Sequence, residues 1–382
     1  MNPAPVHFTL TRWVNITLIA VFGVLLWLPT IDTFFHIDYT PAINEKRIPA
    51  ELPHFKSLPG GLKEYLGGLE ACFNDHFGYR NQLIRWQIDW RRTFFQAVGE
   101  SGPNVIIGSD GWLYYARCEM VEHYRGLRQF APQNLRDWQA LLEHRRDWLA
   151  RRGIKYIFVV APDKHSIYSE HLPIWMTKVR PESKLDQFLA YMRAHSTVKV
   201  LDLRPALFDA CRIAPTYFKT DTHWNAFGGF VACQEIAKML PGVEPLSLAS
   251  FDLGKAAAPN GDLAGMLGLR ITEENGVSLT PKSGVPSLEL STNLVGNPEY
   301  RGPFFTKNPQ GKGAALVFCD SFGVALRPFL GCHFGKVTYL RKPELDRVWI
   351  EQEKPDVVIC EMVEREFNTQ EPDSLKEKDA LN

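Results

Sequence analysis

The chain has 382 residues, of which 45% are hydrophobic, which is enough for one large α/β domain with its own core plus extensions. Lys and Arg balance Asp and Glu at 43 residues each. This balance gives no electrostatic reason to expect binding to nucleic acid or to an anionic membrane surface, so we expect no nucleic-acid partner.

The first predicted element is a membrane anchor at residues 13–31. This segment is almost wholly apolar and uncharged, and its length matches the hydrocarbon core of a bilayer. Arg12 precedes it, whereas Asp32 and Asp38 follow, which favours residues 1–12 in the cytoplasm and the rest of the chain outside it. A cleaved signal peptide is the main alternative, although Pro29, Thr30 and Ile31 do not form a small-x-small cleavage site. A buried soluble helix is a third interpretation.

Residues 32–72 are predicted to form a linker and juxtamembrane region, because several prolines interrupt regular periodicity after the anchor. A helical pattern covers residues 61–95, interrupted at 73–80. Residues 106–115 favour a hairpin that turns at 108–111.

Helix and strand patterns alternate from Pro132 onward. Helices are expected at 132–152 and 182–195. Short apolar runs rich in β-branched or aromatic residues predict five strands, at 155–161, 198–203, 314–319, 336–340 and 356–360. Such runs are typical of a parallel sheet buried on both faces, so we expect a three-layer α/β domain over residues 73–366. Residues 245–310 read as an insertion, and 367–382 as a flexible tail.

Two short segments about a hundred residues apart carry residues for acyl transfer. Asp221 and His223 lie within residues 220–225, and Ser321 lies within residues 318–323, where a predicted strand turns into a helix. A serine hydroxyl becomes a good nucleophile when an imidazole takes its proton, and a carboxylate orients that imidazole. The strand-to-helix turn would expose the hydroxyl and place the Ser321 N–H near a developing oxyanion.

Each of these residues also has a structural explanation. A serine before a helix is often only an N-cap, and an Asp-x-His triplet is often ordinary loop chemistry. A metal site at Asp221 and His223 would need a third ligand, for which His165 and His171 are the candidates. The seven cysteines show no metal-ligand spacing, and a disulfide between two of Cys72, Cys118, Cys211 and Cys233 is possible.

Taken together, the two segments resemble the alginate O-acetyltransferase family of AlgJ and AlgX proteins. Residues 220–225 are similar to that family's Asp-x-His-Trp signature, and residues 319–322 to its Gly-Asp-Ser-Phe block, with Cys319 in place of the glycine. Further similarity lies in short motifs spread between residues 73 and 366, namely 74–80, 111–114, 162–164, 167–168, 172–173, Glu361 and 364–365.

The resemblance implies an SGNH-hydrolase-like fold in which the Asp and His precede the Ser. It also implies a triad of Ser321 as nucleophile, His223 as general base and acid, and Asp221 as orienting group, without metal or cofactor. The implied location is the bacterial inner membrane, with the catalytic domain in the periplasm. The implied partners are a multi-pass membrane acyltransferase as acetyl donor, a polysaccharide acceptor and other exopolysaccharide synthesis proteins.

Four further residues are candidates for substrate binding. Lys164 and Tyr168 are suited to hold an anionic or hydroxyl-rich substrate, Arg365 to bind a sugar carboxylate, and Trp224 to stack on a sugar ring. The alternatives are loop stabilisation for Lys164 and Tyr168, an ion pair with Glu361 or Glu364 for Arg365, and packing behind the His loop for Trp224. Asp320 is expected to accept hydrogen bonds from the turn that presents Ser321.

Three functions remain open from the sequence. The first is an O-acetyltransferase acting on an exopolysaccharide such as alginate or cellulose. The second is an SGNH-type polysaccharide O-acetylesterase, in which water replaces the sugar hydroxyl. The third is a non-catalytic, polysaccharide-binding subunit of a secretion complex that uses Trp112, Tyr114 and Trp224.

Overall fold

The structure is a computed structural model and describes residues 6–40, 49–53, 61–86, 104–258, 260–291 and 303–379. The chain divides into two compact units. The smaller comprises residues 1–97 with 265–269, and the larger comprises residues 98–264 with 270–382. The expected linker at 41–48 and 54–60, and the helical pattern at 87–95, fall outside the described residues.

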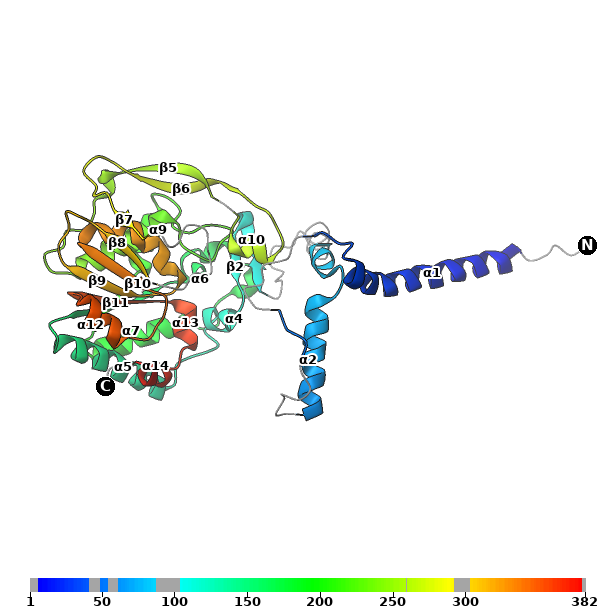
Figure 1. The fold of residues 1–382 in the computed structure, drawn as a ribbon, viewed down its shortest axis with the longest axis horizontal. Helices are drawn as coiled ribbons and strands as arrows, with labels where there is room; N and C mark the ends of the chain where they lie inside the picture. The colour runs from blue at the N-terminus through cyan, green and yellow to red at the C-terminus, as the bar shows by residue number, and fades with distance from the viewer. Residues whose placement is uncertain are drawn as a thin grey trace, which may run out of the picture. The chain divides into compact units, whose positions relative to one another are not determined.

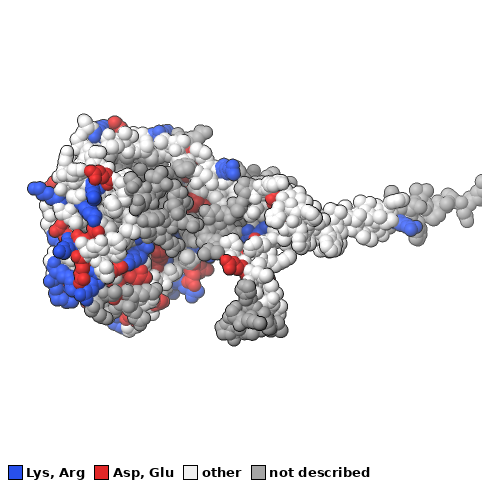
Figure 2. Space-filling view, viewed as in Figure 1, with Lys and Arg blue, Asp and Glu red and all other residues white. Residues whose placement is uncertain are grey.

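The smaller unit begins with the long helix α1 (Val6–Phe35), drawn in dark blue in Figure 1. Its residues Arg12–Phe35 are long and apolar enough to cross a membrane, and the most apolar stretch among them is not buried by the rest of the protein. Figure 2 shows the surface of this helix as almost free of charged side chains. One N-terminal apolar helix of this kind suits either a signal anchor or a signal peptide.

The end of α1 is held by backbone contacts within the same unit. Asp32 accepts hydrogen bonds from the Asp38 N–H at 2.6 Å and the Tyr79 N–H at 2.9 Å. Tyr79 lies just after α2 (Gly61–His76) and before a helical stretch at residues 80–86. A Cβ atom on Gly78 would lie 2.0 Å from the Pro29 carbonyl oxygen, so only glycine permits this approach of the two segments.

In the described part of the larger unit, seven strands form one sheet in the order β4-β3-β11-β9-β10-β8-β7. The five parallel strands are β3 (Lys155–Ala161), β4 (Val200–Asp202), β9 (Ala314–Phe318), β10 (Lys336–Leu340) and β11 (Val357–Val363). All five match predicted strands. The expected α/β fold with a central parallel sheet is confirmed.

Helices cover both faces of this sheet. Along β3, Ile157 and Val159 face one hydrophobic core, while Phe158 and Val160 face the other. The first core receives α8 (Arg204–Cys211), α9 (Ala226–Lys238) and α11 (Arg327–Leu330). The second receives α5 (Pro132–Ala150), α7 (Lys184–His195), α12 (Arg347–Glu353) and α13 (Glu364–Thr369). This alternation buries both sides of every central strand and produces three layers.

The predicted hairpin is present as β1 (Val105–Ile107) and β2 (Leu113–Tyr115). The insertion is more ordered than the sequence indicated. It forms the ribbon β5 (Phe251–Ala258) and β6 (Glu273–Pro281), seen at the top of Figure 1. It also contributes β7 (Glu289–Leu290) and β8 (Phe304–Lys307), which extend the sheet as antiparallel strands next to β10. In the sequence, the short helix α10 (Asp262–Met266) comes between β5 and β6.

The C-terminal segment, expected as a flexible tail, contains helix α14 (Pro372–Lys378). Leu375 is fully buried in the second core. Asp379 accepts hydrogen bonds from Arg145 Nε at 2.7 Å and Nη2 at 2.8 Å, and both side chains are buried. A buried guanidinium needs a nearby carboxylate, so Arg145 fixes this end of the chain to α5.

All seven cysteines lie among the described residues, and all are free thiols. The possible disulfide among Cys72, Cys118, Cys211 and Cys233 is therefore not formed. On the face of the larger unit that Figure 2 shows, basic and acidic side chains are intermingled, as the balanced composition leads one to expect.

Candidate active site

The turn that carries Ser321 follows β9 directly. Ser321 is the first residue of the 3₁₀ helix Ser321–Leu326, and Asp320 is its N-cap. The Asp320 carboxylate accepts the Phe322 N–H at 2.7 Å and the Val363 N–H, at the end of β11, at 2.6 Å. The expected contact between Asp320 and its turn is thus confirmed. The second contact ties the turn to a neighbouring strand of the sheet.

Cys319 lies buried beneath this turn. A Cβ atom on Gly323 would lie 2.4 Å from the Cys319 sulfur, so the thiol fills the space under the 3₁₀ helix and Gly323 leaves room for it. Burial holds the pKa of the Cys319 thiol well above its ordinary value. Cys319 is therefore a packing residue rather than a second nucleophile.

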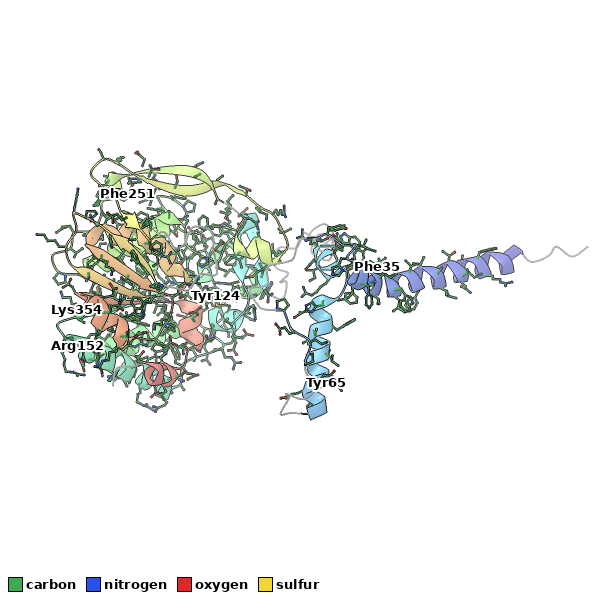
Figure 3. The ribbon with its side chains drawn as sticks, viewed as in Figure 1. Phe35, Tyr65, Tyr124, Arg152, Phe251 and Lys354 are labelled. Atoms are coloured by element: carbon green, nitrogen blue, oxygen red, sulfur yellow. The ribbon has the colours of Figure 1, made fainter. Side chains whose placement is uncertain are left out.

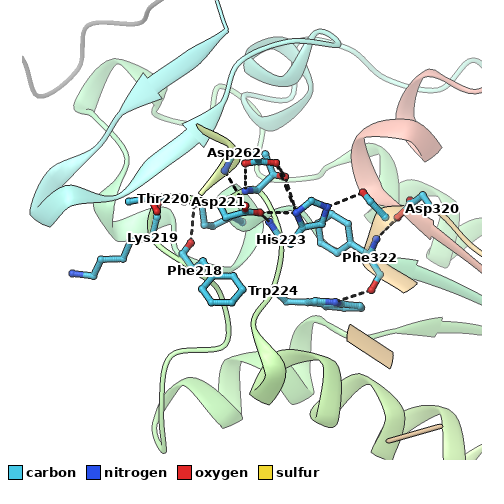
Figure 4. Close-up of polar contacts among 12 residues, drawn as sticks. Phe218, Lys219, Thr220, Asp221, His223, Trp224, Asp262, Asp320 and Phe322 are labelled. Atoms are coloured by element: carbon cyan, nitrogen blue, oxygen red, sulfur yellow. Dashed lines mark hydrogen bonds and ion pairs between the residues drawn. The ribbon is translucent and has the colours of Figure 1, made fainter. Parts of the chain in front are cut away.

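The loop that carries Asp221 and His223 precedes α9. Asn225 caps this helix, because its side-chain oxygen accepts the N–H groups of Phe227 and Gly228 at 2.9 and 3.1 Å. Trp224 is only 1% exposed, and its indole N–H donates to the Phe322 carbonyl oxygen at 3.0 Å. This bond joins the His loop to the Ser321 turn, as Figure 4 shows.

Asp221, His223 and Ser321 form one hydrogen-bonded chain. The distance from His223 Nδ1 to Asp221 Oδ1 is 2.6 Å, and that from His223 Nε2 to Ser321 Oγ is 2.7 Å. An ionised carboxylate only accepts, so the proton belongs on Nδ1 and the Nε2 lone pair faces the hydroxyl. The side chains of His223 and Asp221 are 25% and 23% exposed. The site is therefore open to solvent and to a substrate.

The environment keeps Asp221 ionised. Burial alone would raise the pKa of its carboxyl group, but the hydrogen bond and charge of His223 outweigh burial. The backbone N–H groups of Asp262 and His223 act in the same direction and donate to Asp221 at 2.9 Å each. The pKa of Asp221 thus lies below its ordinary value, as an orienting carboxylate requires.

Asp262, from the start of α10, is a member of this cluster that the sequence did not reveal. Its carboxylate accepts the Thr222 N–H at 2.8 Å and the Thr222 hydroxyl at 2.7 Å, and lies 3.8 Å from His223 Nδ1. It follows the turn Asn260-Gly261, where a Cβ atom on Gly261 would lie 2.2 Å from the Thr220 carbonyl oxygen. A glycine immediately before the acid was the only signal in the sequence.

A second carboxylate from the insertion holds the start of the loop. Glu273, at the start of β6, accepts the N–H groups of Lys219 and Thr220 at 3.1 and 2.6 Å, and the Thr220 hydroxyl at 2.7 Å. The insertion thus fixes the His loop by two acidic side chains, Asp262 and Glu273.

Asp221, His223 and Asp262 are also the described groups whose atoms lie close enough together to hold a metal ion. The third member is Asp262 and not His165 or His171. Both carboxylate oxygens of Asp262 already accept hydrogen bonds from Thr222, and His223 Nδ1 already bonds to Asp221. These hydrogen bonds engage the atoms that would have to bind a metal ion. The arrangement is therefore one that orients the His223 imidazole.

The four candidates for substrate binding are all buried. Lys164 Nζ donates to the carbonyl oxygens of Phe218, Lys219 and Asp221 at 3.0, 2.9 and 2.7 Å. Burial lowers the Lys164 pKa to about 7. The hydroxyl of Tyr168 accepts the Thr216 N–H at 2.8 Å.

Arg365 donates to Asp163 at 2.6 Å, so the ion pair expected for it exists with a different partner. Together with the bond from Trp224 to Phe322, these contacts favour the structural alternatives for all four residues.

The sequence comparisons with known proteins concern about half of the chain. Residues 105–286 match the family model described as SGNH hydrolase-like domain, acetyltransferase AlgX. This stretch includes Asp221 and His223 and ends before Ser321. A probable alginate O-acetylase AlgJ from Pseudomonas putida is 31% identical over 191 residues, which is 47% of this chain and 46% of the relative. The chain thus spans about half the length of the curated relatives it matches.

Two solved structures share the fold. Bacillus cereus PatB1, solved with a sulfonyl adduct, has 17% identity and a TM-score of 0.51, covering 72% of this chain and 98% of that protein. A DHHW family protein from Eubacterium siraeum has 15% identity and a TM-score of 0.53, covering 74% of this chain and 97% of that one. Through its Asp-x-His-Trp loop and the match over residues 105–286, the chain is similar to the AlgJ/AlgX proteins, which are SGNH hydrolase-like acetyltransferases.

Proposed function

We propose that the protein is an O-acetyltransferase that acetylates hydroxyl groups of an exopolysaccharide through an acetyl-Ser321 intermediate. The observation that carries the proposal is the hydrogen-bonded chain from Asp221 through His223 to Ser321, with links of 2.6 and 2.7 Å. Similarity to the AlgJ/AlgX proteins supports acetyl transfer as the reaction and alginate, or a similar polysaccharide, as the acceptor class.

In the first half-reaction, His223 Nε2 takes the hydroxyl proton as Ser321 Oγ attacks the carbonyl carbon of the acetyl donor. The resulting oxyanion faces the Ser321 N–H, which lies at the start of the 3₁₀ helix. As the tetrahedral intermediate collapses, the donor's leaving group departs with the proton from His223. Asp221 stabilises the imidazolium that exists between these two proton transfers.

In the second half-reaction, His223 removes a proton from a sugar hydroxyl, whose oxygen attacks the acetyl-serine carbonyl. Collapse returns the proton to Ser321 Oγ and releases the acetylated sugar. Water in place of the sugar would give net ester hydrolysis with the same groups. Acceptor binding therefore decides between transferase and esterase.

The N-terminal helix suggests where this reaction takes place. If α1 is retained, it would anchor the chain in the bacterial inner membrane, with residues 1–12 in the cytoplasm and the catalytic domain, 73–366, in the periplasm. The acetyl group would then come from a multi-pass membrane acyltransferase. Other exopolysaccharide synthesis proteins would deliver the acceptor.

The test uses the full chain in detergent with p-nitrophenyl acetate, with and without acceptor oligosaccharides, comparing wild type with Ser321→Ala. We expect Ser321-dependent appearance of acetylated oligosaccharide by mass spectrometry. Ser321-dependent release of acetate alone would favour the esterase. Absence of any Ser321-dependent turnover would contradict both enzymatic functions and favour a binding subunit.

A further inference from the structure

A second polar pocket, of about 310 Å³, lies at the carboxyl ends of β4, β3 and β11. Ligands of open α/β sheets bind at this edge, and the Ser321 turn lies farther along it, after β9. Tyr124, labelled in Figure 3, is one of the residues that line it. The other lining residues come mainly from α4 (Met120–Tyr124), α6 (Lys164–Ile167), α8 and α13.

Three buried side chains on its wall have polar atoms without a hydrogen-bond partner among the described residues, namely His123, His165 and Asn368. His123 is 3% exposed, and neither of its ring nitrogens makes a hydrogen bond. The Glu119 carboxylate lies 3.9 Å from its Nε2, beyond hydrogen-bond distance. Asn368 is 7% exposed, and its side-chain oxygen is also unpaired. Buried polar groups are usually paired, so these atoms indicate a hydrogen-bonding ligand.

The charges that line the pocket nearly cancel. Arg204 is held by Asp202 at 2.9 Å and Asp186 at 2.8 Å, so its guanidinium is already neutralised. Burial lowers the pKa of His123 to about 4, which leaves its ring neutral at pH 7. Lys178 is the remaining cation on the wall, and Glu364 the remaining acid. Nothing here selects strongly for an anion or a cation.

The rest of the wall suits a hydroxyl-rich ring. Neutral imidazole offers one donor and one acceptor, and the Asn368 oxygen a further acceptor, which together match sugar hydroxyls that both donate and accept. Tyr124 and the half-exposed Phe208 provide aromatic surface for the apolar face of a sugar. A volume near 300 Å³ lies at the small end of ligand pockets and fits about one ring.

We propose that this pocket binds one uncharged, pyranose-sized sugar unit. Binding there needs neither Ser321 nor the acetyl donor. If the proposed transferase function is also correct, the shared sheet edge makes the pocket a subsite for the acceptor chain and favours a neutral glycan over a polyuronate. That second statement rests on the proposed function, whereas the binding itself does not.

The test is a saturation-transfer NMR titration of the full chain in detergent. The probe is methyl β-D-glucopyranoside, and its matched control is methyl β-D-glucuronide, which differs by a carboxylate. We expect the neutral sugar to bind at least about 10-fold more tightly, because the remaining cation, Lys178, is exposed to solvent, whereas the acid Glu364 is buried in the wall. Equal binding of both sugars, or binding of neither, would overturn the proposal. The unpaired polar atoms of the wall would then be explained by hydrogen bonds to ordered water.

Variants locate the binding. His123→Phe keeps the ring shape but removes both nitrogens, and Asn368→Ala removes one acceptor. Each should weaken glucoside binding about 3- to 10-fold, the effect of one lost hydrogen bond. His195→Phe, on an exposed histidine at the end of α7, is the matched control and should bind normally.

Ser321→Ala should also bind normally, so loss of transfer and loss of sugar binding are distinguishable. If His123→Phe does not fold, two measurements still test the proposal. They are glucoside binding by Asn368→Ala and the comparison of the two sugars on the wild-type protein. Unchanged glucoside affinity in a folded pocket variant would place the sugar elsewhere and refute the proposal.

Discussion

Two aspartates of the larger unit each pair with a basic side chain, in opposite surroundings. Asp221 bonds to His223 at 2.6 Å and remains 23% exposed, and its pKa lies below the ordinary value. Asp163 bonds to Arg365, also at 2.6 Å, but is almost fully buried. There burial raises the carboxyl pKa despite the neighbouring guanidinium.

The comparison separates a reactive pair from a structural one. The partly exposed imidazole of His223 can exchange protons with Ser321 and a substrate, because solvent and ligand reach it. The buried Arg365 guanidinium has no such access, and it also packs against the rings of Phe322 and Tyr115. Changes to the first pair should therefore alter turnover, and changes to the second should alter stability.

Breaking the reactive pair should have the largest effect. Asp221→Asn would favour the wrong imidazole tautomer, and we expect Ser321-dependent turnover of p-nitrophenyl acetate to fall about 1,000- to 10,000-fold, as in serine triads generally. Asp209→Asn, at an exposed ion pair with Arg212, is the control and should retain activity. Near-normal turnover in Asp221→Asn would contradict the orienting role of Asp221.

Breaking the structural pair should mainly lower stability. Asp163→Asn removes the carboxylate that the buried Arg365 guanidinium hydrogen-bonds to, so we expect a loss of about 3–5 kcal/mol in the free energy of unfolding. Chemical denaturation of the full chain in detergent measures it. Glu351→Gln, at an exposed ion pair with Arg347, should cost less than about 1 kcal/mol. Equal costs for the two variants would mean that burial is not the distinguishing factor.

Asp262 places a second negative charge near His223. It lies 3.8 Å from Nδ1, so Asp262→Asn should destabilise the imidazolium and lower turnover about 10-fold, after allowance for the partial exposure of the site. The amide still accepts from Thr222, so thermal stability should change little. A pH-rate profile displaced to lower pH would distinguish this charge effect from loss of loop structure, which would leave the profile in place.

The smallest expected effect is on the pH dependence of stability. Burial raises the pKa of Glu364 from its ordinary 4.5 to about 7. Between these values the folded protein holds a proton that the unfolded chain has lost, so stability falls as pH rises through this window. The slope from this group is at most about 1.4 kcal/mol per pH unit. Glu364→Gln should flatten it, and an unchanged slope would show that Glu364 titrates normally.

The sequence predicted the parts of this architecture that are local. All five parallel strands are short apolar runs, and Asp221 and His223 are two residues apart. The partners that stabilise the site come from distant segments. Asp262 and Glu273 lie in an insertion without clear periodicity, and Asp163 finds Arg365 across 202 residues. Such contacts depend on tertiary packing, which no pattern within a window of sequence specifies.

The same reason explains the differences in the fold. Strand β7 has only two residues, too few for a period to appear. The segment 367–382 is rich in charge, yet Asp379 finds a buried partner in Arg145, 234 residues earlier. Lys164, Tyr168, Trp224 and Arg365 were predicted as candidates for substrate binding, and their structural contacts lie across distant segments. Sequence alone could not show that they are buried.

The most direct test of the account asks where the acetyl group resides. Full-length protein in detergent would be mixed with p-nitrophenyl acetate, quenched in acid within the first turnover, digested and analysed by mass spectrometry. The account predicts one acetyl group on the peptide that contains Ser321, and none on that peptide in Ser321→Ala. Turnover that continues in Ser321→Ala, or an acetyl group carried by another residue, would contradict it.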